Sequence, residues 1–167
     1  MVEFALISPL FFLLLFGGIE MGLMFRGNLA IEDMTRNASR VASIQRDNPD
    51  ADRFILQVIA DRAEPLSGEV TKVIIFHAPT LDSDLPPACI DGSDLPFTVS
   101  NVCNSYGPGY EAVAAGTAPM ETGLTANERN QWNNLGVYVE YEYQSITGII
   151  DDITLRSSTV EVVELDL

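Results

Sequence analysis

The chain has 167 residues, with 24 acidic and 9 basic side chains and a formal net charge of −15. Such an acidic chain would repel nucleic-acid phosphates, which excludes nucleic acid as a partner. An acidic surface also keeps an extracellular domain soluble. Once the apolar N-terminal segment is set aside, the remainder is long enough for one modest folded domain.

The first 25 residues form an apolar segment of membrane-spanning length. Sixteen uncharged residues separate Glu3 from Glu20, and about 22 helical residues would rise about 33 Å, enough to cross a bilayer core. A signal peptide would begin with basic residues and end in a small-residue cleavage site, and this segment has neither feature. The first basic residue is Arg26, so the distribution of basic residues does not decide which end of the segment faces the cytoplasm. Removal of a basic leader would explain why no basic residue precedes the segment.

The carboxylates within this segment indicate a role beyond anchoring, because hydrocarbon penalises charged side chains. We expect Glu3 to pair with the α-amino group of Met1, in its own chain or in a neighbouring copy, which would favour one axial stagger between helices. Pro9 loosens the helix. Glycines that would let helices approach closely occur at Gly17, Gly18, Gly22 and Gly27. We therefore expect a helix that leaves the lipid and packs on copies of itself. A bent membrane anchor is the alternative.

The same segment carries a family pattern: an acidic–aromatic pair, an Ala-Leu step, a proline, an aliphatic run, and then Gly-x-x-Glu-x-Gly. The sequence fits this pattern at Glu3, Phe4, Ala5, Leu6, Pro9, Gly17 or Gly18, Glu20 and Gly22. In this it resembles the N-terminal signature of TadE-like proteins, which are pilin-like subunits of the tight-adherence (Flp, type IVb) pilus systems.

The resemblance implies processing by a prepilin peptidase, insertion in the bacterial inner membrane, and assembly with other pilus subunits into an extracellular filament. In such prepilins the glutamate is the fifth residue of the mature chain. Here it is the third, so we expect the printed chain to be mature or truncated. The implied assembly residues are Met1, Glu3, Phe4, Pro9, Gly17, Gly18, Glu20 and Gly22.

The leading interpretation is thus a structural subunit that polymerises through its N-terminal helix. One alternative is a minor, tip or initiating subunit with an adhesive role, acting through the long loop that follows the first strand. Another is a membrane-anchored binding domain that never polymerises.

We expect three parts: a membrane or filament-core helix over 1–26, a helical extension with a second helix over 27–64, and a β-rich extracytoplasmic domain over 65–167. Apolar residues continue at helical spacing beyond the membrane segment, which predicts one helix from about Phe4 to Arg46. A second helix begins at Asp50 or Asp52 and ends before Pro65.

Three segments rich in β-branched or alternating residues predict strands at Glu69–His77, Leu135–Tyr143 and Ile153–Leu165. Between the first two, Thr125 to Glu128 form a capping box, which predicts a short helix. The order of elements indicates an α+β, pilin-like fold in which a long helix packs on an antiparallel sheet.

Residues 79–110 contain five prolines and are predicted to be irregular. Cys89 and Cys103 lie here with thirteen residues between them, and we expect a disulfide if the domain is extracytoplasmic. Two unrelated buried thiols are the alternative. Four aspartates in this stretch are interpreted as solvated turns rather than as a calcium site, because their spacing fits no EF-hand loop: Asp82, Asp84, Asp91 and Asp94.

The sequence contains no glycine-rich phosphate loop, metal-ligand spacing or catalytic set with positional support. The single histidine, His77, is interpreted as structural or surface-exposed, and Glu140 with Glu142 as a solvated strand face. We expect no enzymatic activity, no cofactor and no metal site.

Overall fold

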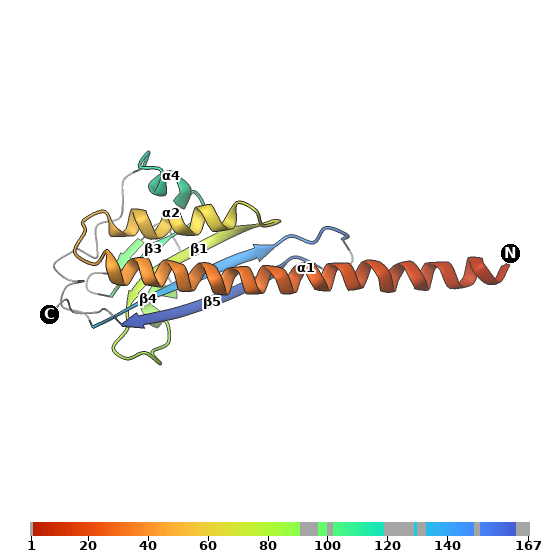
Figure 1. Cartoon of the computed structure of the whole chain (residues 1–167), viewed down its shortest axis with the longest axis horizontal. Helices are drawn as coiled ribbons and strands as arrows, with labels where there is room; N and C mark the ends of the chain where they lie inside the picture. Colours follow the sequence, from red (N-terminus) through yellow and green to blue (C-terminus); the bar gives the residue numbers. More distant parts are fainter. Residues whose placement is uncertain are drawn as a thin grey trace.

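The computed structural model describes residues 2–90, 97–99, 102–118, 129, 133–148 and 151–162, and of these only the backbone is described for residues 2–5, 97 and 98. Helix α1 runs from Val2 to Ile44 and helix α2 from Ala51 to Ala63. Both helices were predicted from apolar spacing and are confirmed within a few residues. The first half of α1 projects well beyond the rest of the molecule (Figure 1).

Five antiparallel strands form one sheet in the order β2-β3-β1-β4-β5. The strands are β1 (Gly68–His77), β2 (Phe97–Val99), β3 (Cys103–Tyr106), β4 (Asn134–Tyr143) and β5 (Ile153–Val162). The predictions of β1, β4 and β5 are confirmed, and so is the α+β arrangement of a long helix on an antiparallel sheet.

The prediction that residues 79–110 are irregular is wrong in part. This stretch contains β2 and β3, together with the short helix α3 (Pro87–Ile90), and at its end begins α4 (Tyr110–Ala114). β3 has only four residues and no apolar alternation, so its strand state comes from pairing with β1, where Phe76 lies opposite Cys103. Tertiary pairing outweighs weak local preference in such short strands.

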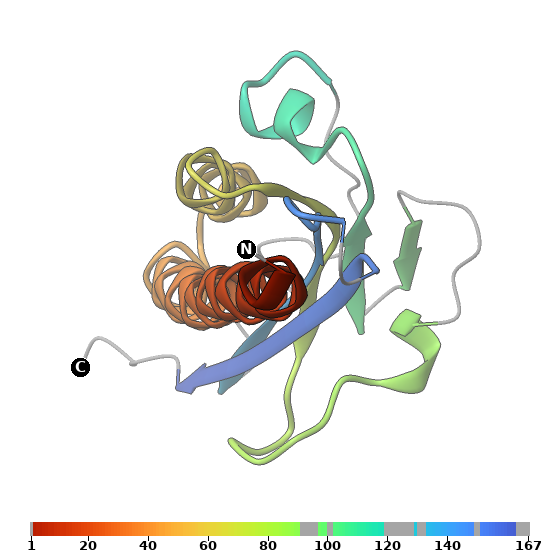
Figure 2. The same cartoon turned by 90° about the vertical axis from the view of Figure 1, so that its right-hand side faces the viewer.

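Helices α1 and α2 cover one face of the sheet, as Figure 2 shows in a view nearly along α1. The inward face of α1 supplies buried residues at helical spacing: Ile31, Met34, Ala38 and Ala42. They pack on residues that alternate along the strands, among them Val73, Ile75, Val137, Val139 and Tyr141. This is the main core, and it lies beside the second half of α1 only.

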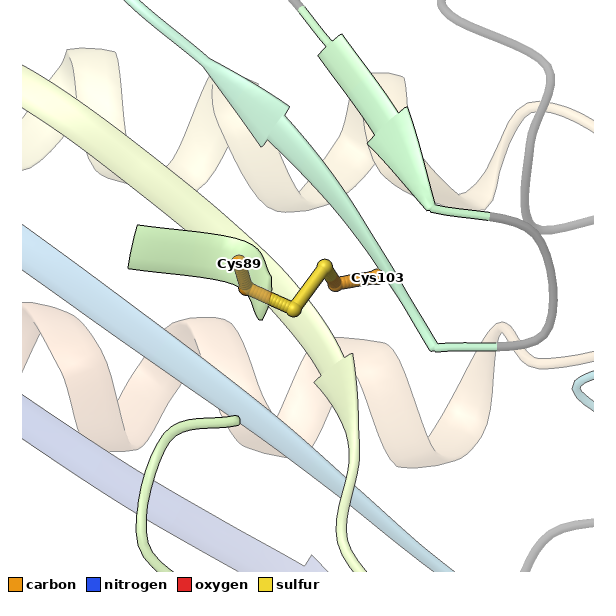
Figure 3. The surroundings of a disulfide bond; sticks show 2 residues. All are labelled: Cys89 and Cys103. Carbon is orange, nitrogen blue, oxygen red and sulfur yellow. A yellow bond between two sulfur atoms is a disulfide. The ribbon is translucent and has the colours of Figure 1, made fainter. Parts of the chain in front are cut away.

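The opposite face of the sheet carries a smaller core under residues 78–90. Cys89 and Cys103 are joined by a disulfide with a Cα–Cα distance of 6.3 Å (Figure 3). The disulfide packs with Ile74 and Phe76 from β1. The bridge therefore ties α3 to β3 and closes this face.

Some predictions fall outside the described residues. The capping box at 125–128, Asp91, Asp94, and residues 163–167 at the expected end of the last strand are among them.

Candidate assembly interface

The first part of α1 is bare. We call residues 6–19 the bare segment, because none of them is buried and most are exposed. Its large apolar side chains include Leu6, Leu10 and Leu14, with 76%, 62% and 66% of their surfaces exposed. Within the described part of the chain, one helix is long and apolar enough to cross a membrane, and the bare segment belongs to it. An apolar surface of this extent marks a site of contact with lipid or protein.

Three of the predicted small-residue positions lie open on this helix, whereas Gly27 is buried against Tyr143 and Leu155. A Cβ atom built at Gly17, Gly18 or Gly22 would meet no other atom within 4 Å. Pro9 is exposed, and the helix continues through it. The three glycines thus leave a flat surface that a second helix could approach closely. Met1 and the side chains of Glu3 and Phe4 lie outside the described part, so the pairing of Glu3 with an amine stays a prediction.

Among the described side chains of α1, which begin at Leu6, Glu20 is the first that is buried, with 0% of its surface exposed. Its carboxylate accepts hydrogen bonds from the Tyr143 hydroxyl (2.7 Å), the Ile146 amide (3.1 Å), and both the amide (3.0 Å) and hydroxyl (2.7 Å) of Thr147. Four donors replace the water that this charge would otherwise need. We call this arrangement the Glu20 clasp.

The clasp fixes the loop between β4 and β5 against α1. In Figure 1 this connection reaches farther along α1 towards its N-terminus than the other described parts of the domain. Burial and the hydrogen bond to Glu20 raise the pKa of Tyr143 to about 12, so its hydroxyl remains a donor at physiological pH. Glu20 therefore marks the boundary between the bare segment and the folded domain.

Sequence reasoning did not find these partners of Glu20. It treated the carboxylate as an assembly residue and left open a pairing with Arg26 of a neighbour. The donors lie 123 to 127 positions away along the chain. No local spacing signals such a contact. Within one chain Glu20 already has its hydrogen-bond partners, and its role in assembly stays a prediction.

A second buried polar cluster surrounds Asp52 of α2. Its carboxylate accepts hydrogen bonds from Asn104 Nδ2 (2.6 Å) and the Tyr106 hydroxyl (2.8 Å), and pairs with the buried guanidinium of Arg129. Arg129 also donates to the carbonyl of Asn48 at 3.3 Å. Both carboxylate oxygens are occupied, so the cluster ties α2, β3 and Arg129 together and leaves no oxygen free for catalysis.

The remaining candidate residues lie on the sheet and the loops. His77 is half-buried at the end of β1, and burial lowers its pKa. Glu140 accepts a hydrogen bond from the Tyr138 hydroxyl at 2.9 Å, whereas Glu142 is exposed. Over the ranges that the structure describes, no three His, Cys, Asp or Glu side chains are grouped closely enough to hold a metal ion.

A long helix with a bare apolar half, packed by its other half on an antiparallel sheet, defines the pilin-like class of α+β proteins. Residues 1–40 match the model of the TadE-like protein family. Over those residues the chain is TadE-like, with a hydrophobic N-terminal helix. No curated protein and no solved structure matches the chain significantly. The family match therefore rests on α1, where the sequence resemblance was found.

Proposed function

We propose that this chain is a structural subunit that polymerises through α1 into a Tad/Flp-like pilus or a related surface filament. The observation that carries the proposal is the bare segment itself. Its apolar side chains contribute nothing to the core of the domain, which is complete beside the second half of α1. This surface needs lipid or protein to cover it.

The open glycines favour packing between copies over simple anchoring. A helix that stays in lipid has no need of a small-residue surface, whereas helices that pack closely do. Gly18 and Gly22 are spaced four residues apart, so they lie on the same face of α1. The position of this face, away from the clasp, leaves it accessible to a second helix.

Assembly would proceed from the membrane. The chain resides in the bacterial inner membrane, a prepilin peptidase frees the amine of Met1, and Glu3 pairs with the amine of a neighbouring copy. The assembly machinery then moves the helix from lipid into the filament core, together with other pilus subunits. Every stagger other than the paired one leaves a charge without a partner in apolar surroundings.

The test is the substitution Glu3→Ala. We expect it to abolish filaments while the protein still accumulates in the membrane, as measured by electron microscopy of sheared surface material and immunoblots of membrane fractions. The matched control is Glu64→Ala, which removes an exposed carboxylate from the C-terminal end of α2 and should leave assembly unchanged. Normal filaments from the Glu3→Ala variant would defeat the charge-pairing mechanism.

A minor, tip or initiating subunit is the second candidate. It is favoured by segment 78–90, which the disulfide ties to β3 on the sheet face away from α1. Abundance separates the two: a main subunit dominates sheared filaments and a minor one is scarce. A non-polymerising, membrane-anchored binding domain is the third candidate. It requires that a chain without residues 4–19 be a secreted monomer with full binding activity.

A further inference from the structure

An open cavity of about 210 Å³ lies where the domain meets the membrane-proximal part of α1. Leu23 and Arg26 of α1 line one side, the turn at Pro65–Leu66 lines another, and Tyr141 and Ile146 complete it. Its polar lining residues are Arg26, Ser67, Tyr141 and Tyr143, and the Tyr143 hydroxyl already donates to Glu20. Since a water molecule takes about 30 Å³, the cavity has room for a small polar group and a few carbons rather than a large ligand.

Two polar groups of the lining, the Arg26 guanidinium and the Tyr141 hydroxyl, have no partner among the described residues. Tyr141 has only 1% of its surface exposed, and no described residue forms a hydrogen bond with its hydroxyl. Arg26 is exposed and forms no ion pair with any residue of the described ranges. Both groups are hydrogen-bond donors on residues that line the cavity, so an anionic oxygen inside it could accept from both.

The height of the cavity along α1 indicates where such an oxygen comes from. The bare segment ends at Ile19, and Arg26 lies six residues beyond Glu20, a rise of about 9 Å along the helix. With the clasp at the edge of the hydrocarbon core, the long Arg26 side chain, which tilts back towards the N-terminus of the helix, would reach the level of the lipid phosphates. Ile146, with 62% of its surface exposed, lies beside the clasp at the same end of the domain. This step rests on the membrane residence that belongs to the proposed function.

We propose that the cavity binds the headgroup phosphate of one phospholipid from the bilayer that α1 spans. Arg26 pairs with the phosphate, the Tyr141 hydroxyl donates a hydrogen bond to it, and the glycerol carbons lie against Leu23, Leu66 and Ile146. Free phosphate fits this site poorly, because an apolar wall cannot replace its hydration shell. A bound lipid would hold the acidic domain upright on the membrane before assembly.

The test uses the full chain in nanodiscs of phosphatidylglycerol and phosphatidylcholine, released into mild detergent and examined by native mass spectrometry. The wild-type chain should retain one phospholipid. Arg26→Gln and Tyr141→Phe should each lower the retained fraction about tenfold, the usual effect of losing one charge-assisted hydrogen bond. The control Arg36→Gln, which changes another exposed arginine of α1 without an ion pair to a described residue, should retain lipid as the wild type does.

Equal retention by the wild-type and Arg26→Gln chains would overturn the proposal, as would displacement of the lipid by millimolar inorganic phosphate. Tyr141→Phe keeps the ring in place, and an unchanged melting curve would separate loss of lipid from loss of fold. The measurement needs no assembly machinery. Filaments without lipid retention would refute this inference alone, and lipid retention without filaments would refute the polymerisation proposal alone.

Discussion

Single side chains decide how the domain is held on α1, and Glu20 is the clearest case. Glu20→Gln keeps the shape of the side chain but turns one oxygen into an NH₂ group. That group would face a backbone N–H, from Ile146 or from Thr147, with which it cannot bond. We expect a lower thermal unfolding midpoint for the full chain in detergent, and a lower one still for Glu20→Ala.

The control for this substitution is Glu142→Gln, which changes an exposed carboxylate on β4 and should leave the midpoint unchanged. Hydrogen exchange adds a local measurement, since the amides of Ile146 and Thr147 should exchange faster in the Glu20 variants. Wild-type protection of these two amides in Glu20→Ala would refute the clasp.

Substitutions at Gly136 and Gly18 distinguish packing within the chain from packing between chains. A Cβ atom at Gly136 would overlap the ring of Phe76, whereas one at Gly18 would meet nothing. We therefore expect Gly136→Ala to destabilise the fold by about 1–3 kcal/mol, as overpacked core positions do. Denaturant unfolding of the purified chain measures this change.

Gly18→Ala serves as the counterpart. Because alanine favours a helix over glycine by about 1 kcal/mol, the monomer should be as stable as before or slightly more so, while filament yield falls if the open glycine surface packs on a second helix. Equal destabilisation by the two alanines would contradict the distinction between the two positions.

Among the elements, α3 and β3 depend most on a covalent tie. The disulfide between Cys89 and Cys103 closes a loop with a sequence separation of 14. Replacing both cysteines by alanine should lower the free energy of unfolding by about 3 kcal/mol in the chain-entropy model. Hydrogen exchange should show the loss in β3, while β4 and β5 keep their protection. A loss spread evenly over the whole sheet would contradict this local role.

The elements also show how far the sequence alone could lead. Helices α1 and α2 and strands β1, β4 and β5 each contain ten or more residues, so their apolar periodicity is easily recognised. β2 and β3 have three and four residues and depend on pairing with neighbours. The bare segment was predictable because it is a long, uninterrupted run of apolar residues. The partners of Glu20 and Asp52 were not, because they come from distant segments that only the folded chain brings together.

For the molecule as a whole, the bare segment and the domain are separable. No residue of 6–19 is buried, and the core begins with Glu20 and the residues that follow it on α1. We expect a chain without residues 4–19 to be a soluble, folded monomer with the melting midpoint of the full chain, measured by circular dichroism and light scattering. A chain that lacks residues 4–25 should melt earlier, because it also loses the clasp.

Because the clasp separates two surfaces with different tasks, natural selection can act on them independently. Substitutions in the bare segment change contacts with lipid and with neighbouring chains, and these contacts tolerate many apolar side chains of suitable size. From Glu20 onward, substitutions on the inward face of α1 must fit a close-packed interior. A family of such chains should therefore vary freely in the acidic domain and its loops while keeping a short, recognisable N-terminal pattern, and its members should be easier to relate through their first 40 residues than through the rest.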